Sequence, residues 1–426
     1  MKKKGFMCYM FSICLMILIL SGCGTVTEKE QEMQEEEQVV LRFFHYQGEA
    51  EAAYNAVFDA YEKEHPNVKI VSEFLNSESY DATLHARIAT KDCPDIIGTR
   101  PGLTQVIPLA AAGYLADLTG QSCLSDISET NLMTASFANG VYGVPTDQSY
   151  ICTFYNKDIF EEYDLSAPKT WNEFMEVCQT LKSKGITPIS LSYKDVWIRQ
   201  LIPYALAPTT IYRYNSDFDN QLYKGLKSFD GEEWNATFIK LKELIDHGYV
   251  TENFLKISYD QQLSAFANGE AAMMIMGSWG VSMIQNLNEN CNFGLFITPA
   301  SDDGINWISA SIGGMLSVYE DSKQKEVAID FLNFFLQNDE VYGQFLEETG
   351  NLSARMNFSA TSNPELQMLT NDIQGSYIFL DVNWPSGFGD EFMKTVEEIS
   401  RGEDISDALK SLNTVWNGRV MGNDRE

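Results

Sequence analysis

Polar residues that interrupt an apolar stretch near the middle of the chain are the first candidates for ligand chemistry. Residues 146–150, TDQSY, separate the short turn-bounded strand 140–145 from the apolar run 151–160. Such a segment belongs in a cleft, where polar side chains can bond a ligand. We therefore predict Asp147 and Gln148 as ligand-binding residues, in a strand that leaves one lobe and enters another.

Motifs of the common catalytic and metal sites are missing from this sequence. There is no G-x-S-x-G, H-E-x-x-H, P-loop or paired-Cys motif, and the four histidines have no metal-ligand spacing. The methionines of residues 273–276 are expected to fill a core. We expect no catalytic residue, no metal and no cofactor. A pair of carboxylates about 5 to 10 Å apart, as in glycoside hydrolases, remains an alternative because 60 residues are acidic.

The charge and length of the chain narrow its partners. With 426 residues, of which 44% are hydrophobic, the chain can bury a large core in two or more domains. A formal net charge of −30 repels nucleic acid and anionic lipid, so neither is an expected partner. The acidic surface is expected to serve solubility.

Cysteine spacing argues against a disulfide framework or a zinc site. Five cysteines follow the N-terminal region at scattered positions and without a C-x-x-C motif. One bridge in an exported protein remains an open alternative. These cysteines are Cys93, Cys123, Cys152, Cys178 and Cys291.

The N-terminal residues are typical of an export signal. Lys2 to Lys4 precede an apolar stretch, residues 6–20, that is shorter than the roughly 20 residues of a spanning helix. Residues 1–22 are therefore predicted to be a signal peptide. Residues 23–38 are rich in Glu and Gln after residue 25 and are predicted to form a disordered tether.

The first half of the chain alternates between strands and helices. Strands at 39–44, 68–74 and 94–98 flank helices at 52–64 and 80–90, which predicts a mainly parallel sheet covered by helices. Ligands of such sheets bind beyond the carboxyl ends of the strands. The residues predicted to lie there are His45, Tyr46, Gln47, Glu73, Thr99 and Arg100. The planar cation of Arg100 suits sugar hydroxyls or a carboxylate.

Three tryptophans follow predicted elements of the second half. Trp197 comes after the strand 186–192. Trp279 comes after the buried strand 271–276, across a Gly-Ser turn that starts a helix with its N-terminus at the cleft. Trp384 lies in a loop nearer the C-terminus.

Several motifs, in order and at compatible spacing, resemble family 1 of the extracellular sugar-binding proteins of bacterial ABC importers, which includes maltose-binding protein. They are G-x-Y-G-x-P at 140–145, Y-N-K-D-x-F at 155–160, P-x-T-W-x-E-F at 168–174, G-x-x-P-I at 185–189 and F-x-x-G-x-A-A-M-x-x-x-G-S-W at 266–279. Residues 20–23, LSGC, are also similar to the lipobox of bacterial lipoproteins, in which the signal is cut before the Cys and lipid is attached to its sulfur.

The resemblance implies a two-lobed α/β fold of class II, like that of periplasmic binding proteins. Each lobe would be a mainly parallel sheet flanked by helices, and three crossing strands would form the hinge on which the lobes close. Lobe 1 is expected to contain residues 39–148 and 310–350, and lobe 2 residues 149–309 and 351–426.

The same resemblance assigns stacking roles to the tryptophans, because an indole covers the flat C–H face of a pyranose. The ligand site would contain Trp197, Trp279 and Trp384, with Gly314 in the crossing segment 307–318. The expected function is that of a monomeric receptor, anchored to the outer face of the membrane through Cys23. It would capture a mono- or oligosaccharide and deliver it to a permease driven by an ATPase subunit. An exported glycoside hydrolase and a binding protein for a non-sugar solute are the alternatives.

Overall fold

The computed structural model describes residues 38–358 and 363–423. The predicted signal peptide, Cys23 and the predicted tether up to residue 37 lie outside these residues. Within the described part of the chain, no helix has the length and apolar character needed to cross a membrane.

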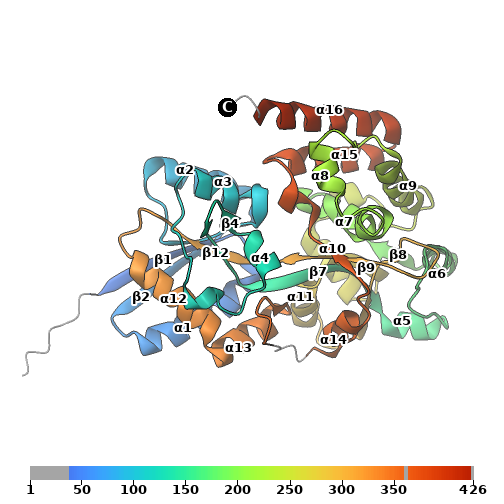
Figure 1. Ribbon diagram of the computed structural model, residues 1–426. Helices are drawn as coiled ribbons and strands as arrows, with labels where there is room; N and C mark the ends of the chain where they lie inside the picture. Colours follow the sequence, from blue (N-terminus) through green and yellow to red (C-terminus); the bar gives the residue numbers. More distant parts are fainter. Residues whose placement is uncertain (1–37, 359–362, 424–426) are drawn as a thin grey trace, which may run out of the picture. The chain divides into compact units, whose positions relative to one another are not determined.

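The first lobe contains a five-stranded sheet. Its strands are β1 (Val39–His45), β2 (Val68–Phe74), β3 (Ile96–Gly98), β6 (Val144–Pro145) and β12 (Met315–Val318), in the spatial order β2-β1-β3-β12-β6. Strand β1 pairs in parallel with β2 and β3, as the alternation of strands and helices predicts, and β12 joins β3 antiparallel (Figure 1). A short hairpin of β4 (Ser136–Phe137) and β5 (Gly140–Val141) belongs to the same part of the chain.

Helices of the first lobe pack on this sheet through aromatic side chains. They are η1 (Gly48–Ala50), α1 (Glu51–Glu64), α2 (Ser77–Thr90), η2 (Gly102–Thr104), α3 (Val106–Ala111), η3 (Ser122–Leu124), α4 (Glu129–Met133), α12 (Lys325–Gln337) and α13 (Asp339–Thr349). Tyr54 and Phe58 of α1 are one helical turn apart, so both rings face the core. Phe58 lies 5.9 Å from Phe331 of α12, between ring centroids. Each such buried ring contributes roughly 1.5–3 kcal/mol.

The second lobe contains a seven-stranded sheet centred on one long strand. Its strands are β7 (Asp147–Asn156), β8 (Thr187–Ser190), β9 (Ala271–Gly277), β10 (Phe293–Phe296), β11 (Ile308–Ile312), β13 (Leu352–Ser353) and β14 (Ser376–Tyr377). Strand β7 pairs antiparallel with β9, β10, β11 and β13, whereas β8–β9 and β11–β14 pair in parallel. The expectation of a mainly parallel sheet is therefore corrected here to a mixed sheet. Strands β11 and β13 run opposite to β7 where the chain crosses between the lobes, and β9 and β10 run opposite to it within the second lobe.

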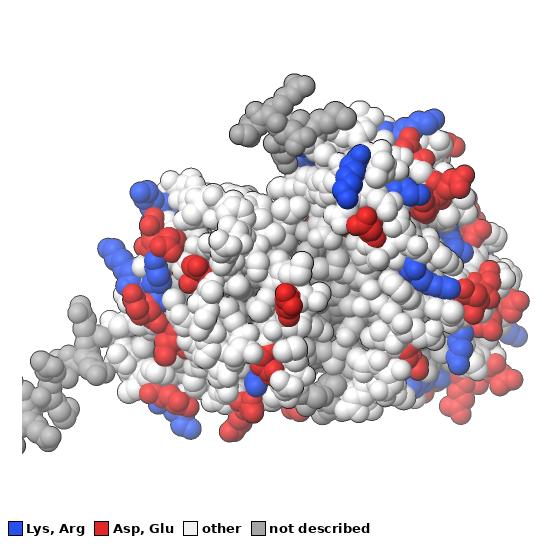
Figure 2. Space-filling model, in the orientation of Figure 1, with Lys and Arg blue, Asp and Glu red and all other residues white. Residues whose placement is uncertain are grey.

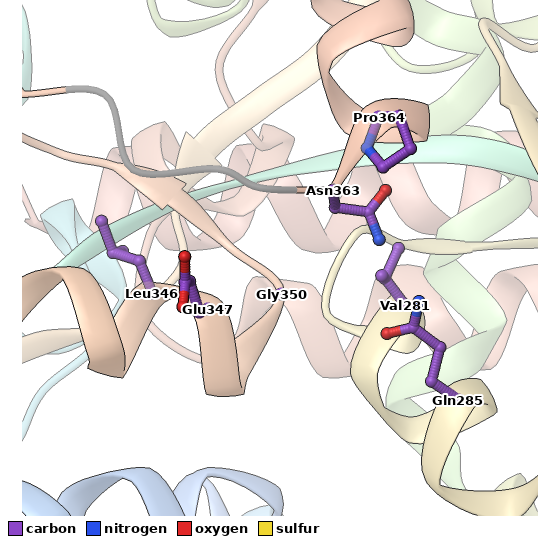
Figure 3. A pocket seen from close by; sticks show the side chains of 7 residues that line it. All are labelled: Val281, Gln285, Leu346, Glu347, Gly350, Asn363 and Pro364. Carbon is purple, nitrogen blue, oxygen red and sulfur yellow. The ribbon is translucent and has the colours of Figure 1, made fainter. Parts of the chain in front are cut away.

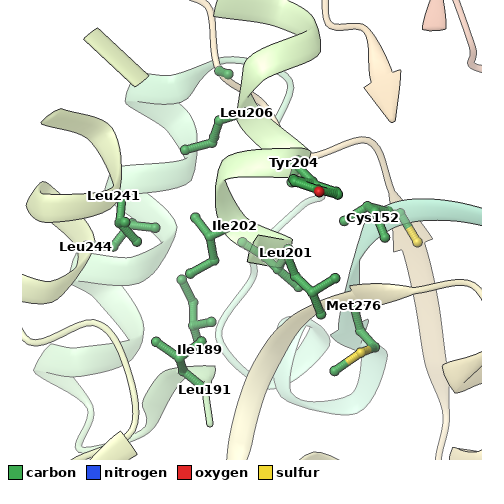
Figure 4. Packing of buried hydrophobic residues seen from close by; sticks show 14 of the residues in the cluster. Cys152, Ile189, Leu191, Leu201, Ile202, Tyr204, Leu206, Leu241, Leu244 and Met276 are labelled. Carbon is green, nitrogen blue, oxygen red and sulfur yellow. The ribbon is translucent and has the colours of Figure 1, made fainter. Parts of the chain in front are cut away.

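Helices of the second lobe enclose a large apolar core. They are α5 (Lys157–Glu162), α6 (Trp171–Ser183), η4 (Val196–Gln200), α7 (Leu201–Ala207), η5 (Pro208–Tyr212), α8 (Phe218–Tyr223), α9 (Glu232–Asp246), η6 (Phe254–Lys256), α10 (Tyr259–Ala267), α11 (Gly280–Leu287), α14 (Pro364–Asn371), η7 (Leu380–Asn383), α15 (Phe388–Ser400) and α16 (Ile405–Asn423). Figure 4 shows Ile202 and Leu206 of α7 packed among Leu241 and Leu244 of α9. Thr170 and Glu173 form the capping box that starts α6, as the sequence indicates.

The chain passes between the two sheets at three places. Strand β6 continues into β7 through Thr146, β11 continues into β12 through Gly313 and Gly314, and α13 leads to β13 through Gly350 and Asn351. The positions of the crossings follow the segments indicated by the sequence. The lobe boundaries drawn from sequence are not otherwise tested and stay a prediction.

One segment after the third crossing packs against the first lobe, although residues 351–426 were expected in lobe 2. Arg355 forms ion pairs with Asp126 and Asp339 of the first lobe, at 3.4 and 2.8 Å. The Phe358 ring lies 5.2 Å from that of Tyr342. The segment returns to the first lobe because its cation and its ring both find partners there.

Charged side chains are spread over the outer parts of the molecule. On the face drawn in Figure 2, Lys, Arg, Asp and Glu lie mainly toward the two ends, and few lie over the middle. Acidic side chains occur at both ends of this face rather than in one patch, as in a surface that favours solubility.

Candidate ligand site between the two sheets

Three aromatic side chains of the second lobe form a cluster, which we call the aromatic wall. The ring of Trp197 lies 5.0 Å from that of Tyr259 and 6.2 Å from that of Trp279, between centroids. All three side chains are partly exposed, although many rings of this lobe are fully buried. The wall therefore offers apolar ring surface to a ligand.

The position of Trp279 depends on the turn that follows β9. Ser278 is buried, and its hydroxyl accepts a hydrogen bond from the Tyr150 backbone N–H at 3.2 Å. The indole of Trp279 folds back over Gly277, where the Cβ atom of any other residue would overlap the ring. The glycine at 277 therefore makes room for the ring of Trp279.

Tyr46 and Arg100 form part of the opposite, polar wall on the first lobe. The Arg100 guanidinium lies 4.5 Å from the centre of the Tyr46 ring and is paired with the carboxylate of Asp81. The side-chain amide of Gln105 donates to the same carboxylate at 3.0 Å. These contacts hold the guanidinium over the ring in one orientation. Burial raises the pKa of the Tyr46 phenol, so the phenol stays neutral and can both donate and accept a hydrogen bond.

Electrostatic effects link side chains of the two walls. Glu49 of the first lobe is exposed, yet the surrounding protein raises its pKa, and the charge of Asp147 raises it further. The pKa of Tyr259, in the aromatic wall, is raised by burial and additionally by the charge of Glu49. Glu49 therefore lies close enough to the aromatic wall to act on it.

Asp381 of η7 extends this arrangement to the second lobe. Its carboxylate accepts a hydrogen bond from the Tyr204 hydroxyl at 2.9 Å. Burial raises the pKa of Asp381, and the positive charge of Arg100, on the first lobe, acts in the opposite direction. The charge of a guanidinium on one lobe thus acts on a carboxylate of the other, and charged groups of both lobes suit a ligand with several hydroxyl groups.

His45 does not reach this site, which corrects its predicted role. Its side chain is fully buried, its Nδ1 accepts a hydrogen bond from the Gln47 backbone N–H at 3.0 Å, and its ring stacks against Tyr46 at 4.7 Å. Burial lowers the pKa of His45 to about 3, so the ring is neutral. Tyr46 follows the end of β1 and is partly exposed, and the buried ring of His45 supports it by stacking against it.

Asp147 and Gly314 lie inside the hinge rather than on a wall, which corrects both predictions. The Asp147 side chain is 1% exposed and accepts hydrogen bonds from the Gly314 backbone N–H and from the Asn351 amide. Each of the three residues stands at a different crossing. Side chains alternate along β7, so Gln148 points to the other, partly exposed face and stays a predicted ligand residue.

The side chains of Trp384 and Glu73 contact other residues of the protein. Trp384 is 1% exposed and packs in the core with Phe388 and Phe392, at 5.3 and 4.8 Å between ring centroids. The predicted contact is corrected, because no face of the ring is free. Glu73 is exposed and forms an ion pair with Arg87 of α2 at 2.7 Å. The ligand roles of Trp279, Trp197, Arg100, Tyr46 and Gln148 stay predictions.

Four residues of the candidate site were not predicted from sequence: Glu49, Asp81, Tyr259 and Asp381. The capping box of Ser258 and Gln261 marks the start of α10 and hence of Tyr259, but it does not say what the ring faces. Asp381 belongs to the loop that was selected for Trp384. The sequence carries no signal for which side chain of that loop turns to the gap.

A separate cavity of about 180 Å³ lies between α11, α13 and α14 (Figure 3). It contains none of the predicted site residues. Its lining includes Val281, Gln285, Leu346, Glu347 and Pro364. Among the described residues, no three His, Cys, Asp or Glu side chains gather in a way that could hold a metal ion, and the five cysteines from Cys93 onward are free thiols.

Comparisons with known proteins agree with this architecture. The family model described as "Bacterial extracellular solute-binding protein" matches residues 47–342. The chain is 23% identical over 408 residues to the multiple sugar-binding protein of Streptococcus mutans, covering 94% of each chain. It is 23% identical over 337 residues to the melibiose/raffinose/stachyose-binding protein MelE of Bacillus subtilis, covering 76% of each.

A solved structure shows the same fold. It is described as "SBP RafE in complex with raffinose" and superposes with a TM-score of 0.78 at 22% identity, over 90% of this chain and all of that one. The likeness confirms the expected fold of two α/β lobes, each a sheet flanked by helices.

Proposed function

This chain belongs to the family of bacterial extracellular solute-binding proteins, and from this premise we propose that it is the saccharide-capturing receptor of an ABC importer. The family consists of extracytoplasmic binding proteins for transport, so the glycoside-hydrolase alternative is set aside. The names of the relatives in Streptococcus mutans and Bacillus subtilis support an oligosaccharide as the ligand.

The observation that carries the proposal is the pair of unlike walls. Trp197, Tyr259 and Trp279 offer ring faces that fit the C–H face of a pyranose. Arg100 and Glu49 of the other lobe offer charged hydrogen-bonding groups to its hydroxyls. A sugar held between the walls would contact both lobes at once, and its polar contacts would become dry when the lobes close.

The attachment of the two walls to different lobes explains how a ligand can close the lobes. One wall stands on each lobe, and the lobes are joined through three crossings that meet at Asp147. A ligand that contacts both walls binds the closed state better than the open one, and this difference drives closure. The closed receptor then presents a defined surface to a permease.

We further propose that the receptor is a monomer attached to the outer face of the cell membrane through lipid on Cys23. The sequence LSGC at residues 20–23 supports this attachment. The permease, with its ATPase subunit on the cytoplasmic side, is the proposed partner, and no cofactor is needed. Metabolic labelling with a fatty-acid analogue tests the anchor, because Cys23→Ser should abolish the label.

Titration calorimetry with a carbohydrate panel tests the function. Raffinose, stachyose, melibiose and chitin oligosaccharides should include at least one sugar that binds, and at 100 times Kd it should add about 2.7 kcal/mol to the free energy of unfolding. Trp279→Ala should weaken that binding at least about tenfold, since a stacked ring contributes more than its area alone. Tyr214→Ala, which removes a ring that is 69% exposed outside the wall, is the control and should bind normally.

Two results would overturn the proposal. One is the absence of heat and of thermal stabilisation for every sugar of the panel, with binding of a polyamine or another non-sugar solute instead. The other is the appearance of cleaved sugar products, which would identify a hydrolase.

A further inference from the structure

Two loops that are far apart in the sequence join the lobes outside the three crossings. The Thr104 hydroxyl, at the end of η2 in the first lobe, donates a hydrogen bond to the carbonyl oxygen of Asp381 at 3.0 Å. It also lies 3.5 Å from the Asp381 carboxylate. Asp381 belongs to η7 of the second lobe, and neither loop is part of a strand that crosses between the sheets.

The contact requires a glycine on the first lobe. Gly102 has a φ of +69°, and a Cβ atom at this position would overlap the backbone oxygen and the side chain of Val382. The two loops therefore touch backbone to backbone. Only glycine combines this backbone conformation with the absence of a side chain.

Each loop is held firmly by its own lobe. The Gly102 backbone N–H donates to the Thr134 carbonyl within the first lobe at 2.6 Å. The Asp381 carboxylate accepts from the Tyr204 hydroxyl, whose side chain is 1% exposed in the core of the second lobe. Because each loop is fixed in its own lobe, moving the lobes apart must break the contact between the loops.

We propose that Gly102, Thr104, Val382 and the backbone carbonyl of Asp381 form an inter-lobe latch, which stabilises the closed state and thereby sets ligand affinity through contacts separate from those made to the ligand. The inference rests on the proposed function, because only a receptor that closes over its ligand gains affinity in this way. The apparent affinity equals the intrinsic affinity multiplied by the fraction of molecules that are closed. Breaking the latch therefore weakens the binding of every ligand by the same factor.

Calorimetry with two latch variants and one matched control tests this inference. Thr104→Val removes the hydrogen bond and keeps the shape of the side chain, so Kd should rise about 3- to 10-fold. Gly102→Ala drives the loops apart and should raise Kd by at least about tenfold. Gly113→Ala is the control, since Gly113 has a φ of +74° but an added Cβ meets nothing within 4 Å. It imposes similar backbone strain and should leave Kd within about twofold of the wild-type value.

The changes in Kd for different sugars distinguish the effect of the latch from that of the aromatic wall. For two sugars that bind wild-type protein, each latch variant should raise both Kd values by one common factor, whereas Trp279→Ala should change them by different factors. If Gly102→Ala does not fold, Thr104→Val carries the test alone. Wild-type Kd values in Thr104→Val, and in Gly102→Ala where it folds, would overturn the latch and leave the proposed function intact. A wild-type protein that binds no sugar would overturn both.

Discussion

At the scale of single residues, the candidate site depends on small side chains that position large ones. Gly277 is the clearest case, because the indole of Trp279 occupies the space in which a side chain at 277 would stand. His45 acts similarly behind Tyr46, which it contacts ring to ring at 4.7 Å. Residues that never touch a ligand can therefore decide where the ligand-facing rings lie.

The substitution Gly277→Ala tests this positioning role. The added methyl group pushes the Trp279 ring away from the strand, so sugar affinity should fall at least about tenfold, with a loss of about 1–3 kcal/mol in the free energy of unfolding. Calorimetry and urea unfolding measure the two effects. Gly389→Ala, where an added Cβ meets nothing within 4 Å, is the control in the same lobe. Unchanged affinity in folded Gly277→Ala would show that the ring position does not matter for binding.

Residue types alone could not predict the whole site. Arg100 and Trp279 were selected as candidates because each follows a predicted buried strand, and their ligand roles stay predictions. His45 and Tyr46 are adjacent at the end of β1, and the sequence does not say which of the two faces the gap. In the same way, the sequence does not say whether Asp381 or Trp384 belongs to the site, since this depends on how η7 packs on the core.

At the scale of elements, the bounds of strands with regular apolar patterns were predicted well, but the strands with which they pair were predicted less well. The bounds of β2 match the prediction, and β1 differs by a single residue. The polar residues of TDQSY were expected to line the cleft, but β7 begins at Asp147 and most of them lie within its pairing. Long-range pairing satisfies the backbone groups of these residues, and that pairing is not encoded in local sequence.

The three crossings meet at the buried carboxylate of Asp147. This carboxylate makes the free energy of unfolding depend on pH. Burial raises the pKa of Asp147 from 3.8 to about 6, and this outweighs the hydrogen bonds from Asn351 and Gly314 that lower it. Between these pH values the folded protein holds the proton more tightly than the unfolded chain does. The contribution of Asp147 to the free energy of unfolding is therefore largest at low pH and falls as pH rises through this window, by about 3 kcal/mol in total.

Asp147→Asn should remove this dependence. The neutral amide carries no proton to release, and Asn351 can rotate its amide to keep the pairing. Urea unfolding at pH 4, 5, 6 and 7 should show the variant gaining stability relative to wild type by about 3 kcal/mol across the series. Asp260→Asn, at an exposed position, serves as the control. Parallel stability profiles for wild type and Asp147→Asn would contradict the charge burial on which this prediction depends.

At the scale of the whole molecule, two separately packed cores share one hinge and face each other with unlike walls. The fold class and the three crossings followed from sequence, because strand and helix patterns and the order of motifs are local properties. The packing of residues 354–358 against the first lobe, and the contact of η2 with η7, did not follow, because both join segments hundreds of residues apart. Neither the ring cluster nor the inter-lobe latch could be located without knowing how the lobes meet.

The most direct test of the account is a crystal structure of the protein with the sugar of the panel that binds most tightly. The account predicts one sugar ring stacked on Trp279, with hydroxyls bonded to polar-wall residues such as Arg100 or Glu49, and with Thr104 still in contact with Asp381. A sugar bound elsewhere, for example in the cavity between α11, α13 and α14, with the space between the walls unoccupied, would contradict it.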